Sequence, residues 1–320
     1  MQNDKIIAVL GGGTMGPGIA TTYILAGFYT NLYSRSQATL DRAKKVVESN
    51  LQLFFEEGII SEQESHNASE RINYTTDLSH AVNGAWYVVE TIVENKDIKK
   101  QLYQQLDEML PEGTIIASNT SYLDIFPLLP PARRPYGIIA HWYAPAHILP
   151  LVEIVKGPET LASVMDTVVQ MHKSCGKTPV RMEKYIPGFI VNRLQSAMTR
   201  EVVHLIENGY CTPEDLDLAV KTSLMPRGLL LGLVERMDFT GLDMMANSLQ
   251  NKAYSPAPPL DRPAMIFDHV EKGEFGVKSG KGFYDYTGIP YEEVLQNRDK
   301  QLLKSIGIVQ AFMENPLHNQ

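Results

Sequence analysis

Short apolar runs recur along the first half of the chain, and segments with a helical spacing of apolar residues separate several of them. Each run has the length and composition of a buried β-strand. The runs are Ile6–Leu10, Ala85–Val89, Thr114–Ala117, Gly137–Ala140 and Leu151–Val155. Strands that alternate with helices pair in parallel, so the pattern predicts an α/β fold with a Rossmann-type doubly wound sheet.

The clearest helical pattern lies between Leu40 and Phe54, where apolar residues recur at intervals of three and four. This spacing places them on one face of a helix, which we expect to end at Gly58. Ser61 and Glu64 then have the spacing of a capping box, and this predicts the start of another helix.

The β-type pattern disappears after Met182, and helical patterns replace it. They cover Ile190–Ile206, a capped start at Thr212–Glu214, and Leu229–Leu249. The second half therefore predicts an all-helical domain. The Pro187–Gly188 pair punctuates the chain between the two patterns, so we expect a cofactor-binding domain at 1–186 and a helical domain for substrate binding and dimerisation at 187–320.

Composition and charge narrow the class of protein. The chain has 320 residues with 44% hydrophobic and 21% charged, which is typical of a globular protein of two domains. A formal net charge of -8 argues against a partner such as nucleic acid or an anionic membrane. Only Cys175 and Cys211 occur, with no zinc-type spacing, and no signal peptide or membrane span is visible. We expect a cytoplasmic protein without a metal.

A glycine-rich segment, Gly-Gly-Gly-Thr-Met-Gly, directly follows the first predicted strand and precedes a helical segment. It contains the GxGxxG pattern, whose glycines permit a tight turn and close approach to a pyrophosphate. The N–H groups at the start of the helix attract the phosphates. The position in a βα unit predicts a dinucleotide cofactor held by Gly11, Gly13, Thr14, Met15 and Gly16.

In the dinucleotide-binding fingerprint a second strand follows the helix, about 20 residues beyond the glycines, and here its end falls at Leu32–Tyr33. The residues after this strand bear on which dinucleotide binds. An acidic residue there is typical of NAD(H) binding, because its carboxylate accepts from the adenosine ribose. This chain instead has Ser34, Arg35 and Ser36, with no acidic residue before Asp41. A guanidinium and hydroxyls suit a 2′-phosphate, so the segment favours NADP(H), with NAD(H) as the alternative. Arg35 as a solvated surface residue is the structural alternative.

Candidate catalytic residues lie in or directly after the later predicted strands. Ser118–Ser121 comes after one predicted strand, His141 ends the next, and Glu153 lies in the one after that. Ligands of open α/β sheets bind at the carboxyl ends of the strands. A short loop joins the strands of His141 and Glu153, so a hairpin would bring the two side chains together as a proton-exchanging imidazole and its orienting carboxylate. A purely structural histidine is the alternative.

Six segments that contain these residues together resemble the 3-hydroxyacyl-CoA dehydrogenase superfamily. They occur in order over nearly the whole chain: Gly11–Gly16, Val89–Asn95, Ser118–Ser121, His141 with Pro145 and Leu151–Glu153, Pro187–Arg193 and Lys278–Tyr284. The resemblance implies hydride transfer between a nicotinamide cofactor and C3 of a small-molecule 3-hydroxy or 3-oxo acid, or of its acyl-CoA thioester.

The resemblance also implies roles for single residues. His141 would exchange the hydroxyl proton, and Glu153 would hold the imidazole and stabilise its cation. Ser121 and Asn192 would hydrogen-bond the substrate oxygen.

Two further expectations come from the same resemblance. Glu94 and Lys99 match positions that contact the cofactor's ribose. The helical second domain is the part through which this family dimerises, which implies a homodimer.

Three differences from the acyl-CoA enzymes concern the substrate. Those enzymes have Asn and Lys where this chain has Ala144 and Pro150. The stretch His147–Glu153 resembles the branch with L-gulonate 3-dehydrogenase and carnitine dehydrogenase, which act on small free hydroxy acids. That branch has an Arg five residues before a Gly, as in Arg227 and Gly232. We therefore expect Arg227 to bind a substrate carboxylate, with an interhelical or dimer-interface ion pair as the alternative.

Two other functions remain open at this point. A 6-phosphogluconate-type β-hydroxyacid dehydrogenase also has an Arg after its second strand, but it uses a catalytic Lys near the domain junction, where this chain has Lys184. A non-catalytic cofactor-binding protein of the same fold is the other alternative, because folds can keep a cofactor site after losing the chemistry.

Overall fold

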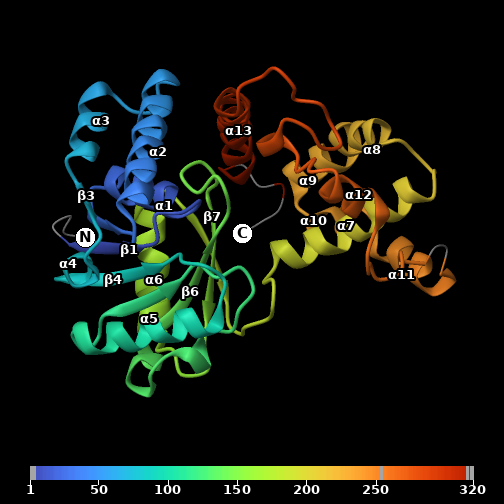
Figure 1. The fold of residues 1–320 in the computed structure, drawn as a ribbon. Helices are drawn as coiled ribbons and strands as arrows, with labels where there is room; N and C mark the ends of the chain where they lie inside the picture. The colour runs from blue at the N-terminus through green and yellow to red at the C-terminus, as the bar shows by residue number, and fades with distance from the viewer. Residues whose placement is uncertain (1–4, 253–254, 315–316, 318–320) are drawn as a thin grey trace. The chain divides into compact units, whose positions relative to one another are not determined.

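One sheet of eight strands organises the first part of the chain (Figure 1). The computed structural model describes residues 5–252, 255–314 and 317. The strands are β1 (Ile6–Leu10), β2 (Tyr29–Tyr33), β3 (Ile72–Thr75), β4 (Ala85–Glu90), β5 (Ile115–Ser118), β6 (Gly137–Trp142), β7 (Leu151–Lys156) and β8 (Thr178–Met182).

The strands lie in the order β3-β2-β1-β4-β5-β6-β7-β8. All neighbours pair in parallel except β6 and β7, which form an antiparallel pair. This topology confirms the prediction of a Rossmann-type sheet and of a hairpin between the last two predicted strands. The sequence pattern did not single out β3 and β8, because these edge strands are only partly buried and lack a continuous apolar run.

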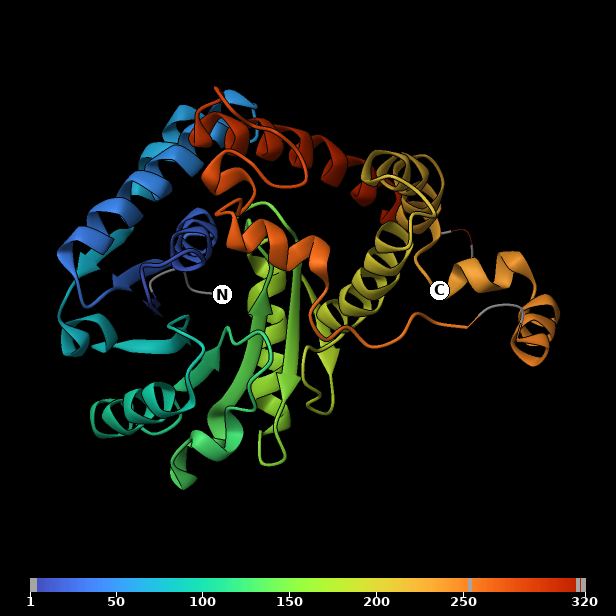
Figure 2. The same cartoon turned by 45° about the vertical axis from the view of Figure 1, so that its right-hand side comes forward.

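Helices cover both faces of this sheet (Figures 1 and 2). They are α1 (Gly16–Leu25), α2 (Gln37–Glu56), α3 (Glu62–Ser69), α4 (Leu78–Val82), α5 (Lys96–Met109) and α6 (Ala162–Ser174). Because side chains alternate along a strand, Ile7 and Val9 of β1 join a core with α1, α2 and α6, whereas Ala8 and Leu10 join a second core with α4 and α5. Two buried layers therefore hold the sheet from either side.

Local signals for the first helices are confirmed. The helix α2 ends at Glu56, and Gly58 just after it has a φ of +69°, a conformation that favours glycine. The capping box at the start of α3 is complete, since Ser61 and Glu64 bond to each other's backbone N–H groups.

The described chain divides into two compact units, Met1–Asn192 and Arg193–Gln320. Helices α7 (Val191–Glu207), α8 (Pro213–Ala219), α9 (Met225–Leu231), α10 (Glu235–Thr240), α11 (Leu242–Asn251), α12 (Ala264–Glu271) and α13 (Tyr291–Glu314) make up the second unit. This confirms an all-helical C-terminal domain. Within the described residues, no helix is both long and apolar enough to cross a membrane.

The helical pattern predicted over Leu229–Leu249 is confirmed, but it is not continuous. The segment contains parts of three helices, which are interrupted at Gly232 and Gly241. Both glycines have a positive φ, 68° and 93°, which a continuing right-handed helix does not allow.

The N-cap predicted at Thr212 is confirmed, because its side chain accepts from the backbone N–H of Asp215 at 3.1 Å.

Candidate active site

The glycine turn between β1 and α1 has the shape that the motif predicts. Gly11 has a φ of +129°, and a Cβ there would lie 2.6 Å from the Thr91 carbonyl oxygen. A Cβ on Gly16 would overlap the Gly11 carbonyl, so both positions require glycine. No atom lies within 4 Å of the place where a Gly13 Cβ would stand, which leaves the outer side of the turn open.

The N-terminus of α1 has the features of an anion-binding site. No side chain caps the helix at Met15, and its first turn contains no acidic residue. Its first backbone N–H groups and the positive end of its dipole are therefore available for a ligand. Together with the open side of the turn at Gly13, this fits the diphosphate of a dinucleotide cofactor.

The carboxyl end of β2 places the cofactor-discriminating residues near this turn. Ser34 is half-buried and adjoins Gly12, whereas Arg35 and Ser36 are exposed. The Ser36 hydroxyl does not cap α2. The first acidic residue, Asp41, accepts a hydrogen bond from Gln37 at 2.9 Å along the helix. The end of the strand thus presents a cation and hydroxyls.

The hairpin of β6 and β7 sets His141 directly opposite Glu153. Nδ1 of His141 lies 2.9 Å from Oε2 of Glu153, and the Glu153 side chain has no exposed surface. The same carboxylate accepts from the Tyr143 hydroxyl at 2.8 Å and from the backbone N–H groups of Ile190 and Val191 at 2.9 and 3.0 Å. Four donors therefore hold one buried carboxylate.

These donors decide the charge of Glu153. Burial raises the pKa of the carboxyl, but the hydrogen bonds from His141, Tyr143 and the two amides outweigh it and hold the pKa below its usual value. Glu153 is therefore ionised near neutral pH and accepts from Nδ1 of His141. The N–H on Nδ1 leaves Nε2 as the nitrogen that can take and return a proton.

Aromatic rings fix the plane of the imidazole. The ring centroid of His141 is 4.5 Å from that of Tyr143 and 5.0 Å from that of Phe189. Burial and the bond to Glu153 raise the pKa of the Tyr143 hydroxyl, so it stays a donor. This role of Tyr143 could not be predicted from the sequence, since nothing in the spacing of Tyr143 distinguishes it from a core aromatic residue.

Phe189 has a backbone conformation that bulky side chains rarely adopt. Its φ is +50°, directly after Gly188 at +78°. This turn leads into α7 and directs the amides of Ile190 and Val191 to Glu153. The Pro187–Gly188 pair, from which the sequence predicts a domain boundary, is also the sequence signal for this tight turn before a helix.

Ser121, which follows β5, lies beside Glu94 of the loop after β4 and Asn192 of the first turn of α7. The Ser121 N–H donates to Oε1 of Glu94 at 2.6 Å, and the Asn192 amide donates to the Ser121 carbonyl at 3.5 Å. The Trp142 N–H next to His141 donates to the Asn119 side chain at 2.8 Å, which ties the end of β6 to the segment that carries Ser121. The sequence-predicted residues of the first unit therefore share the carboxyl edge of the sheet.

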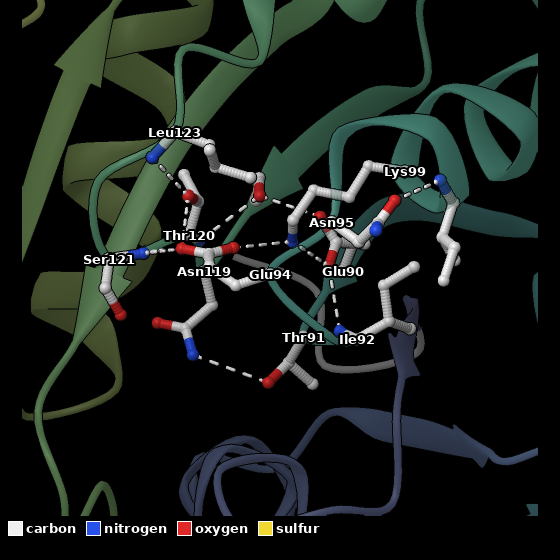
Figure 3. Close-up of polar contacts among 12 residues, drawn as sticks. Glu90, Thr91, Ile92, Glu94, Asn95, Lys99, Asn119, Thr120, Ser121 and Leu123 are labelled. Carbon is white, nitrogen blue, oxygen red and sulfur yellow. Dashed lines mark hydrogen bonds and ion pairs between the residues drawn. The ribbon is translucent and has the colours of Figure 1, made fainter. Parts of the chain in front are cut away.

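Lys99 is placed differently from a surface ligand. Its side chain has no exposed area, and its Nζ lies 2.6 Å from Oε1 of Glu90 and 3.2 Å from Oε2 of Glu94 (Figure 3). Glu90 was not singled out from the sequence as a site residue, although it lies in one of the family segments.

Arg227 lies in α9 of the second unit and is exposed. Its guanidinium donates to the backbone carbonyl and the hydroxyl of Ser223 at 3.1 and 3.2 Å, one turn earlier in the chain. Its binding of a substrate carboxylate stays a prediction.

Two family models match the chain in succession. "3-hydroxyacyl-CoA dehydrogenase, NAD binding domain" matches residues 6–185, and "3-hydroxyacyl-CoA dehydrogenase, C-terminal domain" matches residues 188–286. The chain belongs to the 3-hydroxyacyl-CoA dehydrogenase family. As a member it is an oxidoreductase of the 3-hydroxyacyl-CoA dehydrogenase type, with an NAD-binding domain followed by the family's C-terminal domain.

Relatives in the family match almost end to end. The 5-formyl-3-hydroxy-2-methylpyridine 4-carboxylate 5-dehydrogenase of Mesorhizobium japonicum is 31% identical over 93% of this chain and 96% of its own. The mitochondrial hydroxyacyl-coenzyme A dehydrogenase of Sus scrofa is 34% identical over 88% of this chain and 91% of its own.

A solved structure supports the same relationship. The 5-formyl-3-hydroxy-2-methylpyridine 4-carboxylic acid 5-dehydrogenase, described as an NAD+ dependent dismutase, matches 96% of this chain and 99% of its own. The TM-score is 0.85 at 29% sequence identity. The branch with L-gulonate 3-dehydrogenase and carnitine dehydrogenase stays a prediction.

Proposed function

We propose that the protein transfers hydride between a nicotinamide dinucleotide and C3 of a 3-hydroxy or 3-oxo acid, or of its acyl thioester, with His141 as general acid and base. One observation carries this proposal. A buried, ionised Glu153 orients His141 at the carboxyl edge of the sheet, in the same unit as an open glycine turn that fits a diphosphate.

Each residue has a defined task in this proposal. Nε2 of His141 takes the proton of the substrate hydroxyl during oxidation and returns it during reduction, while Glu153 stabilises the imidazolium. Ser121 and Asn192 hydrogen-bond the substrate oxygen as its charge changes. The bound cofactor supplies the hydride acceptor or donor.

Substitution of His141 tests the assignment. His141→Gln should lower kcat by about 10²- to 10⁴-fold and change the Kd of NADH by less than about twofold, because Gln keeps a polar side chain but transfers no proton. Initial rates with a panel of free 3-oxo acids and their CoA thioesters, each with NADH and NADPH, provide the measurement.

The same panel separates the two alternatives. Lys184, near the end of the first unit, is exposed. A collapse of turnover in Lys184→Met with normal turnover in His141→Gln would favour the 6-phosphogluconate-type mechanism. A wild-type protein that binds NADH but turns over no member of the panel would favour a non-catalytic cofactor-binding protein.

We further propose that the cofactor site prefers NADP(H). The exposed Arg35 and the hydroxyls of Ser34 and Ser36 support this, since they can donate to a 2′-phosphate. The wild type should therefore bind NADPH about tenfold more tightly than NADH, and Arg35→Ala should remove most of the difference. Fluorescence titrations of both cofactors measure it, and equal affinities in the wild type would contradict the proposal.

The substrate is proposed as a small acid that carries a free carboxylate. Ala144 and Pro150 support this proposal, as does a relative named for a pyridine carboxylate, whereas the Sus scrofa relative is named for an acyl-CoA substrate. Arg227 is the residue we propose for the carboxylate. A homodimer and a cytoplasmic location stay predictions, the former supported by large exposed apolar side chains on the second unit, such as Val234 and Leu249.

A further inference from the structure

Tyr143 directly follows β6 and donates its hydroxyl to Oε2 of Glu153 at 2.8 Å. Nδ1 of His141 lies 2.9 Å from the same oxygen. The other oxygen, Oε1, accepts from the backbone N–H groups of Ile190 and Val191. A carboxylate oxygen has two acceptor sites, so the hydroxyl and the imidazole together fill Oε2.

The Tyr143 hydroxyl differs from the two backbone donors in what it does to the imidazole. The amides bond to the opposite oxygen, whereas the hydroxyl withdraws negative charge from the atom that stabilises the imidazolium. Burial raises the pKa of the Glu153 carboxyl, and the bonds from His141 and Tyr143 are among those that lower it. The hydroxyl and the imidazole therefore compete for the charge of one oxygen.

The Tyr143 hydroxyl keeps its proton over the pH range in which a histidine titrates. Burial and the bond to Glu153 raise the pKa of this hydroxyl, and the opposing effect of the Asn192 backbone is smaller. The Tyr143 ring lies against the imidazole, with the two centroids 4.5 Å apart. The hydroxyl therefore donates to Glu153 whether the imidazole is charged or neutral.

The side chains that contact the imidazole come from three places in the fold. Glu153 lies on β7, Tyr143 follows β6, and Phe189 lies in the turn before α7. Of these three, Glu153 carries a charge and Tyr143 is the other group that can ionise. On the β4 side of the site, the charges of Glu94 and Lys99 are paired with each other at 3.2 Å. The charge that faces Nδ1 is therefore that of Glu153, as reduced by its other donors.

We propose that Tyr143 is a positioning residue that makes His141 a weaker base, so that the imidazole releases its proton at a lower pH than it would beside Glu153 alone. This rests on the proposed function and deepens it. Nε2 takes the proton of the substrate hydroxyl during oxidation and returns it during reduction, and the Tyr143 hydroxyl makes the return easier and the uptake harder.

A pH titration of His141 in Tyr143→Phe tests this role. Phe removes the hydroxyl and keeps a ring beside the imidazole, so Oε2 presents more negative charge to Nδ1. The imidazolium should then persist to a pH about 0.5–1 unit higher than in the wild type. ¹⁵N NMR of the whole chain with labelled histidine measures the midpoint, and the signals missing from His141→Gln identify those of His141.

Tyr185→Phe is the matched control. The Tyr185 ring also packs against Phe189, with the centroids 6.2 Å apart, but its hydroxyl donates to the Tyr122 carbonyl at 2.5 Å and not to Glu153. The loss of this hydroxyl should leave the titration midpoint of His141 unchanged. A similar rise of the midpoint in both variants would show that the effect does not pass through Glu153, and this would overturn the proposal.

The pH dependence of turnover gives a second measurement. The acidic limb of the kcat/KM profile for oxidation should move up in Tyr143→Phe by the same amount as the NMR midpoint. A role in packing alone would lower kcat or stability and leave both midpoints in place, so identical His141 titrations in the wild type and Tyr143→Phe overturn the proposal. Normal turnover in His141→Gln would instead overturn the proposed function, and the NMR titration, which needs no substrate, still decides whether Tyr143 acts on His141.

Discussion

Two buried lysines of the first unit, Lys99 and Lys177, are held in opposite ways. Lys99 lies between the carboxylates of Glu90, which ends β4, and of Glu94, which lies in the loop after β4. Lys177, which follows α6, donates to the backbone carbonyls of Ala146, His147 and Leu149 at 2.7, 3.3 and 3.0 Å. The residues that Lys177 holds belong to the segment that joins the strands of His141 and Glu153.

The difference shows how the environment of a buried cation sets its properties. Carboxylates balance the charge of Lys99, whereas carbonyl dipoles give Lys177 hydrogen bonds without a formal counter-charge. Burial accordingly lowers the pKa of Lys177 to about 8, against a smaller opposing effect of Cys175. Lys99 forms ion pairs with two carboxylates. Lys177 holds a loop through hydrogen bonds to backbone carbonyls, and its burial there disfavours its charged form.

The loop that Lys177 fastens also reaches the phosphate-binding helix. A Cβ on Gly18 of α1 would lie 3.2 Å from the Ala146 Cβ and 3.3 Å from the His147 N, so helix and loop are in close contact there. The fastened loop therefore lies between the proposed proton-transferring residues and the start of the cofactor site.

Removal of Lys99 gives the largest effect that the comparison predicts. Lys99→Met leaves Glu90 and Glu94 without their cation, and loss of one partner of a buried ion pair costs about 3–5 kcal/mol. Lys177→Met leaves only carbonyls without a donor, at about 1–3 kcal/mol. The free energy of unfolding, measured by urea unfolding followed by circular dichroism, should therefore be lower for Lys99→Met than for Lys177→Met.

A double variant that also removes the negative charge of Glu90 tests whether the loss of stability comes from an unbalanced buried charge. Lys99→Met combined with Glu90→Gln should be less destabilised than the sum of its single variants, because the buried negative charge is gone. An equal loss of stability in Lys99→Met and Lys177→Met would show that the two environments do not differ as described.

Sequence patterns were sufficient for the parts of the fold that depend on continuous burial. The central strands appeared as apolar runs, and the pairing of His141 with Glu153 followed from a short connection between two such runs. Edge strands such as β3 were missed, since their partial exposure leaves no continuous run. The break at Gly241 was missed because an isolated glycine inside a helical pattern does not by itself end a helix.

In the candidate site, too, some residues could be predicted from the sequence and others could not. Glu94 and Lys99 were recognised only through family segments, and nothing in their spacing shows that the Lys99 side chain is buried between two carboxylates. Glu90 and Tyr143 act on groups brought close by the strand order and the turn at Phe189. Such contacts depend on residues up to tens of positions apart, which no local spacing encodes.

A pH titration of stability provides the smaller and last test of the comparison. In the unfolded chain Lys177 keeps its proton up to its ordinary pKa of 10.5, whereas in the folded protein it loses the proton near pH 8. Between these values the unfolded state binds more protons, so this group makes stability rise with pH, by no more than about 3 kcal/mol in total. Other groups titrate in the same range, and the matched variant removes their contribution. The free energy of unfolding of the wild type relative to Lys177→Met should therefore increase from pH 8 to pH 10, and a difference that stays flat across this interval would contradict the environment assigned to Lys177.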